Sequence, residues 1–235
     1  MKKILISAFA LLAFAACKTN TSTANNAAEN TAAKTYRGEQ PNAVLQLIDT
    51  TQLTTIDSAS INNAINKADV YNVVYWKNRA IIYGDANAIA QIENAFTNIA
   101  NLKVEKQSDV LYNYNRTWCD SVETEGTWRN YILSANLVED TAKQNAYVLA
   151  HNTQREKWPD VGNGFCNANF QQLQIFKMGR QLILIIRVPE GKTLEELDPK
   201  TLENNPKMVE WNHEMKDYQT GIEGTAKGET WVFFQ

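Results

Sequence analysis

Apolar positions along the chain fall into two successive series of elements with the same predicted order, β-α-β-β-α-β. The first series begins near residue 41 with an apolar run, followed by a segment whose apolar residues recur at helical spacing. Two apolar runs separated by Lys77-Asn78 then predict a hairpin, and an amphipathic helix after Asp85 leads into an extended stretch. The predicted elements are a strand at 43–48, a helix containing Ile61 and Ile65, strands at 70–76 and 80–83, a helix with Ile89, Ile92, Phe96 and Ile99 on one face, and a strand over 103–114.

The second series repeats this order, and the segment 74–82 is weakly echoed by 175–183. Its predicted elements are a strand at 131–137, a helix at 140–155, strands at 173–178 and 182–188, a helix at about 205–218 and a final strand at 229–234. Each series alone predicts a ferredoxin-like sheet with helices on one face, which leaves the other face uncovered. Two units in one chain can cover these faces by packing sheet to sheet. We therefore predict an α+β fold of tandem ferredoxin-like units, a pseudo-dimer like a dimeric α/β barrel, which could be a monomer.

The N-terminal segment has a different pattern. Lys2-Lys3, an apolar run and then Phe14-Ala15-Ala16-Cys17 resemble a bacterial lipoprotein signal peptide, in which Cys17 becomes the lipidated first residue. A short transmembrane anchor is the alternative, but the apolar run is too short to span a bilayer comfortably. Low-complexity sequence then predicts a tether. The predicted divisions are 1–16 signal peptide, 17–40 disordered tether, 41–127 degenerate ferredoxin-like domain and 128–235 second domain.

These features predict a protein that is exported and held at the bacterial cell envelope, on the periplasmic face or the outer surface, by lipid on Cys17. Cys119 and Cys166 remain as an even pair in an oxidising compartment, so they could form a disulfide or be two separate buried thiols. The sequence contains no Cys-x-x-Cys, which disfavours redox catalysis.

Composition narrows the function classes. The 235 residues carry 23 Lys and Arg against 26 Asp and Glu, so no positive surplus favours nucleic acid as a partner. With only two histidines the chain cannot form a multi-histidine metal site, although carboxylate or thiolate ligands remain available.

Residues 129–235 carry motifs that resemble the L-rhamnose mutarotase family, enzymes of dimeric α/β-barrel fold that interconvert the anomers of a free sugar. The family's Tyr-x-x-x-His is matched by Tyr147 and His151. The other matching segments are 131–137, Trp158-Pro159-Asp160, 175–182, 209–215 and 228–232. The resemblance implies a small sugar substrate, no metal or organic cofactor, and these roles: His151 as acid/base, Tyr147 as a catalytic or sugar-binding hydroxyl, and Trp211 in the sugar pocket.

The residue types suit that chemistry. Opening a hemiacetal ring requires one group that removes a proton from the anomeric hydroxyl and one that gives a proton to the ring oxygen. Imidazole can do both near neutral pH. Tyr147 and His151 are four residues apart on a predicted helix, so they share one face. An aromatic wall at Trp211 suits the apolar face of a deoxysugar.

The chain departs from the family pattern in ways that keep alternatives open. The stretch between His151 and Trp158 is three residues longer here than in the family. An alignment fixed on Trp158 would therefore place Gln154 where the histidine belongs, and the site would have no acid/base. A tyrosine common on the family's second strand falls near Leu173. The first series has no histidine, which makes it the degenerate half. His151 could also cap a helix, and Trp211 could be a core residue. The rival hypothesis is a non-catalytic carbohydrate-binding or structural lipoprotein that retains the fold.

Overall fold

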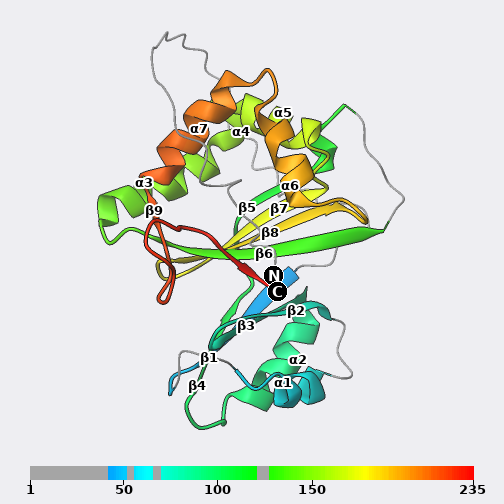
Figure 1. The fold of residues 1–235 in the computed structure, drawn as a ribbon, viewed down its shortest axis with the longest axis vertical. Helices are drawn as coiled ribbons and strands as arrows, with labels where there is room; N and C mark the ends of the chain where they lie inside the picture. The colour runs from blue at the N-terminus through cyan, green and yellow to red at the C-terminus, as the bar shows by residue number, and fades with distance from the viewer. Residues whose placement is uncertain (1–41, 52–55, 66–69, 121–126) are drawn as a thin grey trace.

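The computed structural model describes residues 42–51, 56–65, 70–120 and 127–235. The predicted signal peptide (1–16) and the whole predicted tether (17–40), including Cys17, lie outside the described residues. The described chain forms two antiparallel sheets, each covered on its outer face by helices, so the α+β class is as predicted (Figure 1). No helix among the described residues has the length and apolar character needed to cross a membrane.

The first sheet has the strand order β2-β3-β1-β4, with every neighbouring pair antiparallel. Apolar residues of β1 and β3 that point outward pack against the amphipathic faces of two helices. Asp85 caps the second helix by accepting hydrogen bonds from the backbone amides of Asn87 and Ala88. The elements are β1 (Asn42–Asp49), α1 (Ser58–Ile65), β2 (Val70–Trp76), β3 (Arg79–Asp85), α2 (Ala86–Phe96) and β4 (Leu102–Gln107).

The second sheet has the order β10-β6-β8-β7-β5, and the short strand β9 also pairs with β6. Three longer helices, α3, α5 and α7, cover its outer face. The elements are β5 (Val110–Asn115), η1 (Arg116–Trp118), β6 (Trp128–Leu137), α3 (Thr141–Asn152), α4 (Gln154–Lys157), α5 (Pro159–Asn167), β7 (Gln172–Met178), β8 (Gln181–Pro189), α6 (Leu194–Leu197), η2 (Asp198–Leu202), α7 (Pro206–Lys216), β9 (Gln219–Thr220) and β10 (Val232–Phe234).

The extended stretch predicted over 103–114 is two strands that belong to different sheets. β4 pairs with β1 in the first sheet, whereas β5 pairs antiparallel with β7 in the second. The chain leaves the first sheet at the polar pair Ser108-Asp109, and the buried side chains of Tyr112 and Tyr114 join the core of the second. The first series therefore supplies an edge strand to the second sheet.

The helix predicted over 140–155 is also interrupted. α3 ends at Asn152, where the Thr153 hydroxyl donates to the Leu149 carbonyl at 2.9 Å, and α4 starts at Gln154. Pro159 disfavours helical geometry at Trp158 and then starts α5, a helix that the sequence analysis did not predict. The final strand is shorter than predicted, covering only Val232–Phe234.

The inner faces of the two sheets pack against each other. Their shared core joins Val44, Ile81 and Tyr83 of the first sheet to apolar residues of β6, β7, β8 and β10. Polar contacts cross the same interface: the Tyr83 hydroxyl donates to Gln174 Oε1 at 2.8 Å. At one edge Gln235 exchanges both backbone hydrogen bonds with Tyr75, which ties the end of the second sheet to β2.

Cys119 and Cys166 form a disulfide, with 5.7 Å between their Cα atoms. The bond connects the segment after β5 to α5. The Tyr114 hydroxyl lies 3.1 Å from the Cys119 sulfur and donates to the Phe170 carbonyl at 3.3 Å. β5 is therefore fixed to the helical layer covalently as well as by sheet pairing.

Candidate functional site

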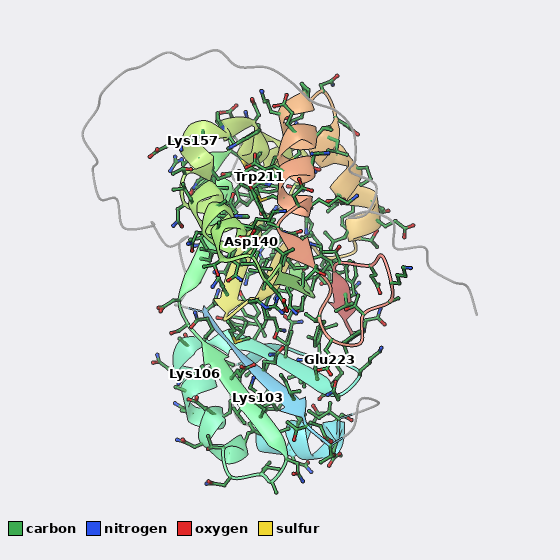
Figure 2. All side chains as sticks on the ribbon, turned by 90° about the vertical axis from the view of Figure 1, so that its left-hand side faces the viewer. Lys103, Lys106, Asp140, Lys157, Trp211 and Glu223 are labelled. Atoms are coloured by element: carbon green, nitrogen blue, oxygen red, sulfur yellow. A yellow bond between two sulfur atoms is a disulfide. The ribbon has the colours of Figure 1, made fainter. Side chains whose placement is uncertain are left out.

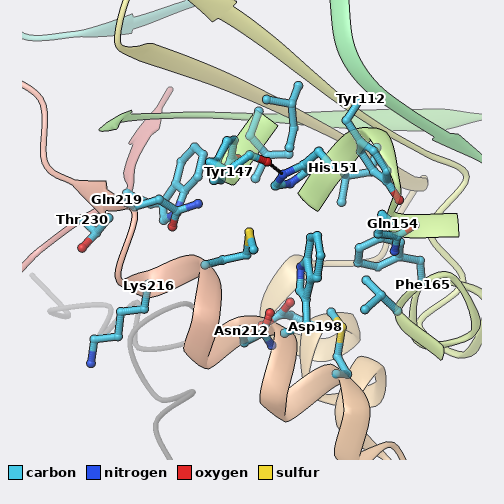
Figure 3. Close-up of a pocket in the computed structure, with 18 of the residues that line it drawn as sticks. Tyr112, Tyr147, His151, Gln154, Phe165, Asp198, Asn212, Lys216, Gln219 and Thr230 are labelled. Atoms are coloured by element: carbon cyan, nitrogen blue, oxygen red, sulfur yellow. Dashed lines mark hydrogen bonds between the residues drawn. The ribbon is translucent and has the colours of Figure 1, made fainter. Parts of the chain in front are cut away.

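A cavity of about 180 Å³ lies between the outer face of the second sheet and helices α3, α5 and α7 (Figure 3). Pockets for drug-sized ligands span roughly 300–1,000 Å³, so this volume favours one small ring. Tyr147, His151 and Trp211 all line it. The ring centroids are 4.1 Å apart for Tyr147 and His151, and 5.0 Å apart for His151 and Trp211. The three residues therefore converge, and they do so beneath the helices rather than between the two sheets.

His151 is held in one tautomer by its own helix. Its Nδ1 lies 2.9 Å from the Tyr147 carbonyl oxygen. Because a carbonyl only accepts, Nδ1 carries the hydrogen and Nε2 carries the lone pair. Burial lowers the pKa of His151 from its ordinary 6.5 to about 4, against the smaller opposing effect of this hydrogen bond. The imidazole is consequently neutral at pH 7 and offers Nε2 as a proton acceptor.

Tyr147 lies one helical turn before His151 and is fully buried. Burial raises the pKa of its phenol, although the neighbouring Gln219 amide acts slightly in the opposite direction. Among the described residues, no hydrogen bond of normal geometry reaches the hydroxyl. Tyr147 therefore presents a protonated hydroxyl, free to bind a polar group in the cavity.

Trp211 extends from α7 into the space between the helices of this half (Figure 2). Its indole contacts Trp158 with centroids 5.7 Å apart, as well as His151. Trp158, which belongs to one of the segments that match the family, thus also supports the aromatic wall. Trp211 combines the two roles considered for it, since it is a buried residue that also lines the cavity.

Several cavity residues were not singled out as site residues from the sequence. Four buried polar atoms have no hydrogen-bond partner in the described part of the chain: the Tyr112 hydroxyl, both amide atoms of Gln154 and the Asn212 amide nitrogen. Buried polar atoms are nearly always paired, so unpaired ones around a cavity point to a polar ligand. Tyr112 comes from β5 and therefore from the predicted first domain. Leu173, near which the family's second-strand tyrosine falls, lines the cavity without a hydroxyl. Tyr112 does supply a phenol to this cavity.

Gln154 had entered the sequence analysis only through the alternative alignment, in which it replaced the histidine. The structure places both Gln154 and His151 at the cavity, because the helix break at Thr153 reorients the chain. Both residues that the two alignments place at the histidine position therefore line the same cavity. The second histidine, His213, is exposed on α7.

Asp198 is the remaining ionisable residue buried beside the cavity, with 6% of its surface exposed. Burial raises the pKa of its carboxyl from 3.8 to about 7. No sequence periodicity distinguished it from the surface acids around it. Among the residues that the structure describes, no three His, Cys, Asp or Glu side chains gather as a metal-binding group.

Two comparisons with known proteins concern the same half of the chain. The family model described as L-rhamnose mutarotase matches residues 132–235. An L-fucose mutarotase from Xanthomonas campestris pv. campestris is 29% identical over 105 residues, which cover 43% of this chain and 78% of that relative. These similarities indicate an enzyme of the carbohydrate-isomerase type. The matched region starts after β5, so Tyr112 lies outside it.

Proposed function

We propose that the protein is an aldose mutarotase that interconverts the anomers of L-rhamnose, L-fucose or a similar free sugar. The observation that carries this proposal is the neutral His151, which has an unprotonated Nε2 and lines a small cavity. The same cavity is lined by buried hydroxyl and amide groups that have no hydrogen-bond partner among the described residues. The comparisons support the reaction class through the segment 132–235.

The site residues divide the work. His151 Nε2 accepts the proton of the anomeric hydroxyl as the ring opens, and returns a proton when the ring closes on the other face of the aldehyde. The Tyr147 hydroxyl donates a hydrogen bond to the sugar, and Tyr112, Gln154 and Asn212 pair with its remaining hydroxyls. Trp211 packs against the apolar face. Each buried group gains a partner only when sugar is bound, which favours a polyhydroxylated ligand.

We propose further that the two sheets form a tandem ferredoxin-like pseudo-dimer. The order β2-β3-β1-β4 in the first sheet corresponds to β7-β8-β6-β10 in the second, and the inner faces share one core. The first unit would then cover the second sheet and lend it β5. The first unit would thus have a supporting role.

The cellular location stays a proposal as well: export, followed by lipid attachment at Cys17 on the cell envelope. The disulfide between Cys119 and Cys166 supports export, since such bonds persist mainly in oxidising compartments. Mass spectrometry of the membrane fraction tests it. A chain that begins at Cys17 with added acyl mass supports the proposal, and an unmodified soluble chain contradicts it.

Saturation-transfer NMR of the anomeric protons tests the activity. We expect the wild-type protein to accelerate exchange for L-rhamnose or L-fucose, and His151→Ala to slow it about 10²–10⁴-fold. His213→Ala is the matched control because it removes the other, exposed histidine and should keep the wild-type rate. Sugar binding without faster exchange would instead support the non-catalytic carbohydrate-binding protein. An unchanged rate in His151→Ala would overturn the residue assignment.

A further inference from the structure

Asp198 has no structural task that explains its burial. It begins η2, and the hydrogen bonds it makes with described residues use its main chain: its N–H donates to the Leu194 carbonyl, and its carbonyl accepts from the Thr201 hydroxyl at 2.7 Å. No described residue donates to its carboxyl group or forms an ion pair with it. A buried carboxyl without a partner is costly, so its presence at a cavity needs an explanation.

Among the described residues, no charged group offsets the effect of burial on Asp198. The other titratable residues at the cavity are Tyr112, Tyr147, His151, Lys216 and Glu229. The elements packed against η2 are α5, α6 and α7, whose ionisable residues are Asp160, Glu195, Glu196, Lys207, Glu210, His213, Glu214 and Lys216. None of these groups contributes to the shift in the pKa of Asp198, which burial alone raises to about 7.

Asp198 and His151 occupy opposite sides of one cavity. Figure 3 shows Asp198 and Asn212 beside α7, on the other side of the cavity lining from Tyr147 and His151. A single sugar ring in about 180 Å³ would lie between the two sides.

We propose that Asp198 is the second proton-transfer group of this site, giving a proton to the ring oxygen while His151 removes one from the anomeric hydroxyl. This inference rests on the proposed mutarotase function and adds to it a residue that the motif resemblance does not include. His151 alone would have to deliver its proton from one oxygen to the other, whereas two groups can act together.

The proton balance closes over one turnover. As the C1–O5 bond breaks, Asp198 transfers its proton to O5, the O1–H proton moves to His151 Nε2, and the O1–H electrons form the C1=O1 bond. The aldehyde then rotates about C1–C2. On reclosure O5 attacks C1, the O5 proton returns to Asp198, and His151 gives its proton to O1. Both residues end in their starting states, and no oxidant, reductant or other co-reactant is consumed.

This arrangement requires a particular protonation state, with His151 neutral and Asp198 protonated. The pKa values of about 4 for His151 and about 7 for Asp198 make that state dominant between these two pH values. The anomer exchange rate should therefore fall at high pH as Asp198 ionises, and fall at low pH as His151 becomes protonated.

The test measures anomer exchange of L-rhamnose and L-fucose from pH 4 to 9 in the full-length protein, with buffer catalysis subtracted. We expect Asp198→Asn to slow exchange about 10²–10⁴-fold and to lose the alkaline decrease, while it still binds sugar. Asp198→Glu should recover part of the rate and show an alkaline decrease at a different pH. Asp217→Asn, an exposed acid at the end of α7, should match the wild type.

A wild-type rate and an unchanged alkaline decrease in Asp198→Asn would overturn the inference while leaving the mutarotase intact. If wild-type protein accelerates neither sugar at any pH, the proposed function fails, and the inference fails with it. Carboxyl ¹³C titration of the wild type gives a readout that does not depend on activity. A signal that titrates near pH 7 and is missing in Asp198→Asn supports the inference, and titration of every carboxyl near pH 4 contradicts it.

Discussion

Burial moves the pKa values of His151 and Asp198 in opposite directions because it disfavours the charged form of each. The imidazole becomes a weaker base and the carboxyl a weaker acid than in water. The usual order of the two pKa values is thereby reversed, so that the carboxyl has the higher one. The neutral form of each group is favoured at mildly acidic pH. No charged neighbour is needed to produce this pair, since the helical layer over the sheet is sufficient.

Tyr147 and Tyr114 provide a matched pair of buried phenols: among the described residues, no hydrogen bond of normal geometry reaches Tyr147, whereas Tyr114 has several. We expect Tyr147→Phe to reduce the anomer exchange rate about tenfold or more, with the free energy of unfolding unchanged or slightly higher. Tyr114→Phe should lower the free energy of unfolding by about 1 kcal/mol and leave exchange nearly unchanged. Urea unfolding and exchange NMR on both variants check this. Parallel losses of stability and activity in both would contradict it.

Sequence reasoning identified residues that belong to a spaced motif. Tyr147 and His151 follow helical spacing, and Trp211 lies in a matching segment, so all three could be expected near one another. Tyr112 and Asp198 could not be placed in the same way. Tyr112 depends on which sheet its strand joins, and Asp198 on a cavity formed by segments far apart in the chain.

At the scale of elements, the decisive feature is the passage of the chain from β4 to β5. Periodicity detects an extended stretch but does not specify its partner strand, so one strand was predicted where two sheets share the segment. A similar limit applies to the helix predicted over 140–155, because no Gly or Pro marks the end of α3 at Asn152. The repeated order of strands and helices was predictable because each element has its own pattern. The irregular segments α4, α6 and η2 lack one.

The disulfide should stabilise this arrangement strongly, because 47 residues separate its cysteines. In the chain-entropy description a loop of this length corresponds to about 4 kcal/mol. We therefore expect the Cys119→Ser, Cys166→Ser double variant to lose about that much free energy of unfolding. Guanidinium unfolding with and without a reductant measures it. Reductant should destabilise the wild type but not the double variant, and a wild type that does not respond would contradict the prediction.

For the whole molecule, the two shifted groups make opposite contributions to the dependence of stability on pH. The folded pKa of Asp198 lies above its unfolded value of 3.8, so its contribution is present below that pH and is lost as the pH rises to about 7. The folded pKa of His151 lies below 6.5, so its contribution is present above that pH and is lost as the pH falls to about 4. Between these limits the two slopes largely cancel.

Replacing Asp198 removes one of the two opposing contributions to the pH dependence of stability. We expect the free energy of unfolding of Asp198→Asn, relative to the wild type, to increase by roughly 2–4 kcal/mol between pH 4 and pH 7.5. The reason is that asparagine does not ionise, whereas the wild-type carboxyl must stay protonated or be buried as a charge. Urea unfolding at pH 4, 5.5 and 7.5 measures the difference, with Asp217→Asn as control. A difference that is constant with pH would contradict the prediction.

The pairing of β5 with β7 determines where the chain can be divided. A fragment starting at 110 keeps the edge strand, both cysteines and Tyr112. A fragment starting at 128, the predicted domain boundary, would lose one cavity wall and leave Cys166 as a free thiol. It would also expose the edge of β7, and an uncovered strand edge invites pairing with other chains. Ser108-Asp109 is therefore the natural point for separating the two halves, and a fragment cut at 128 is expected to aggregate.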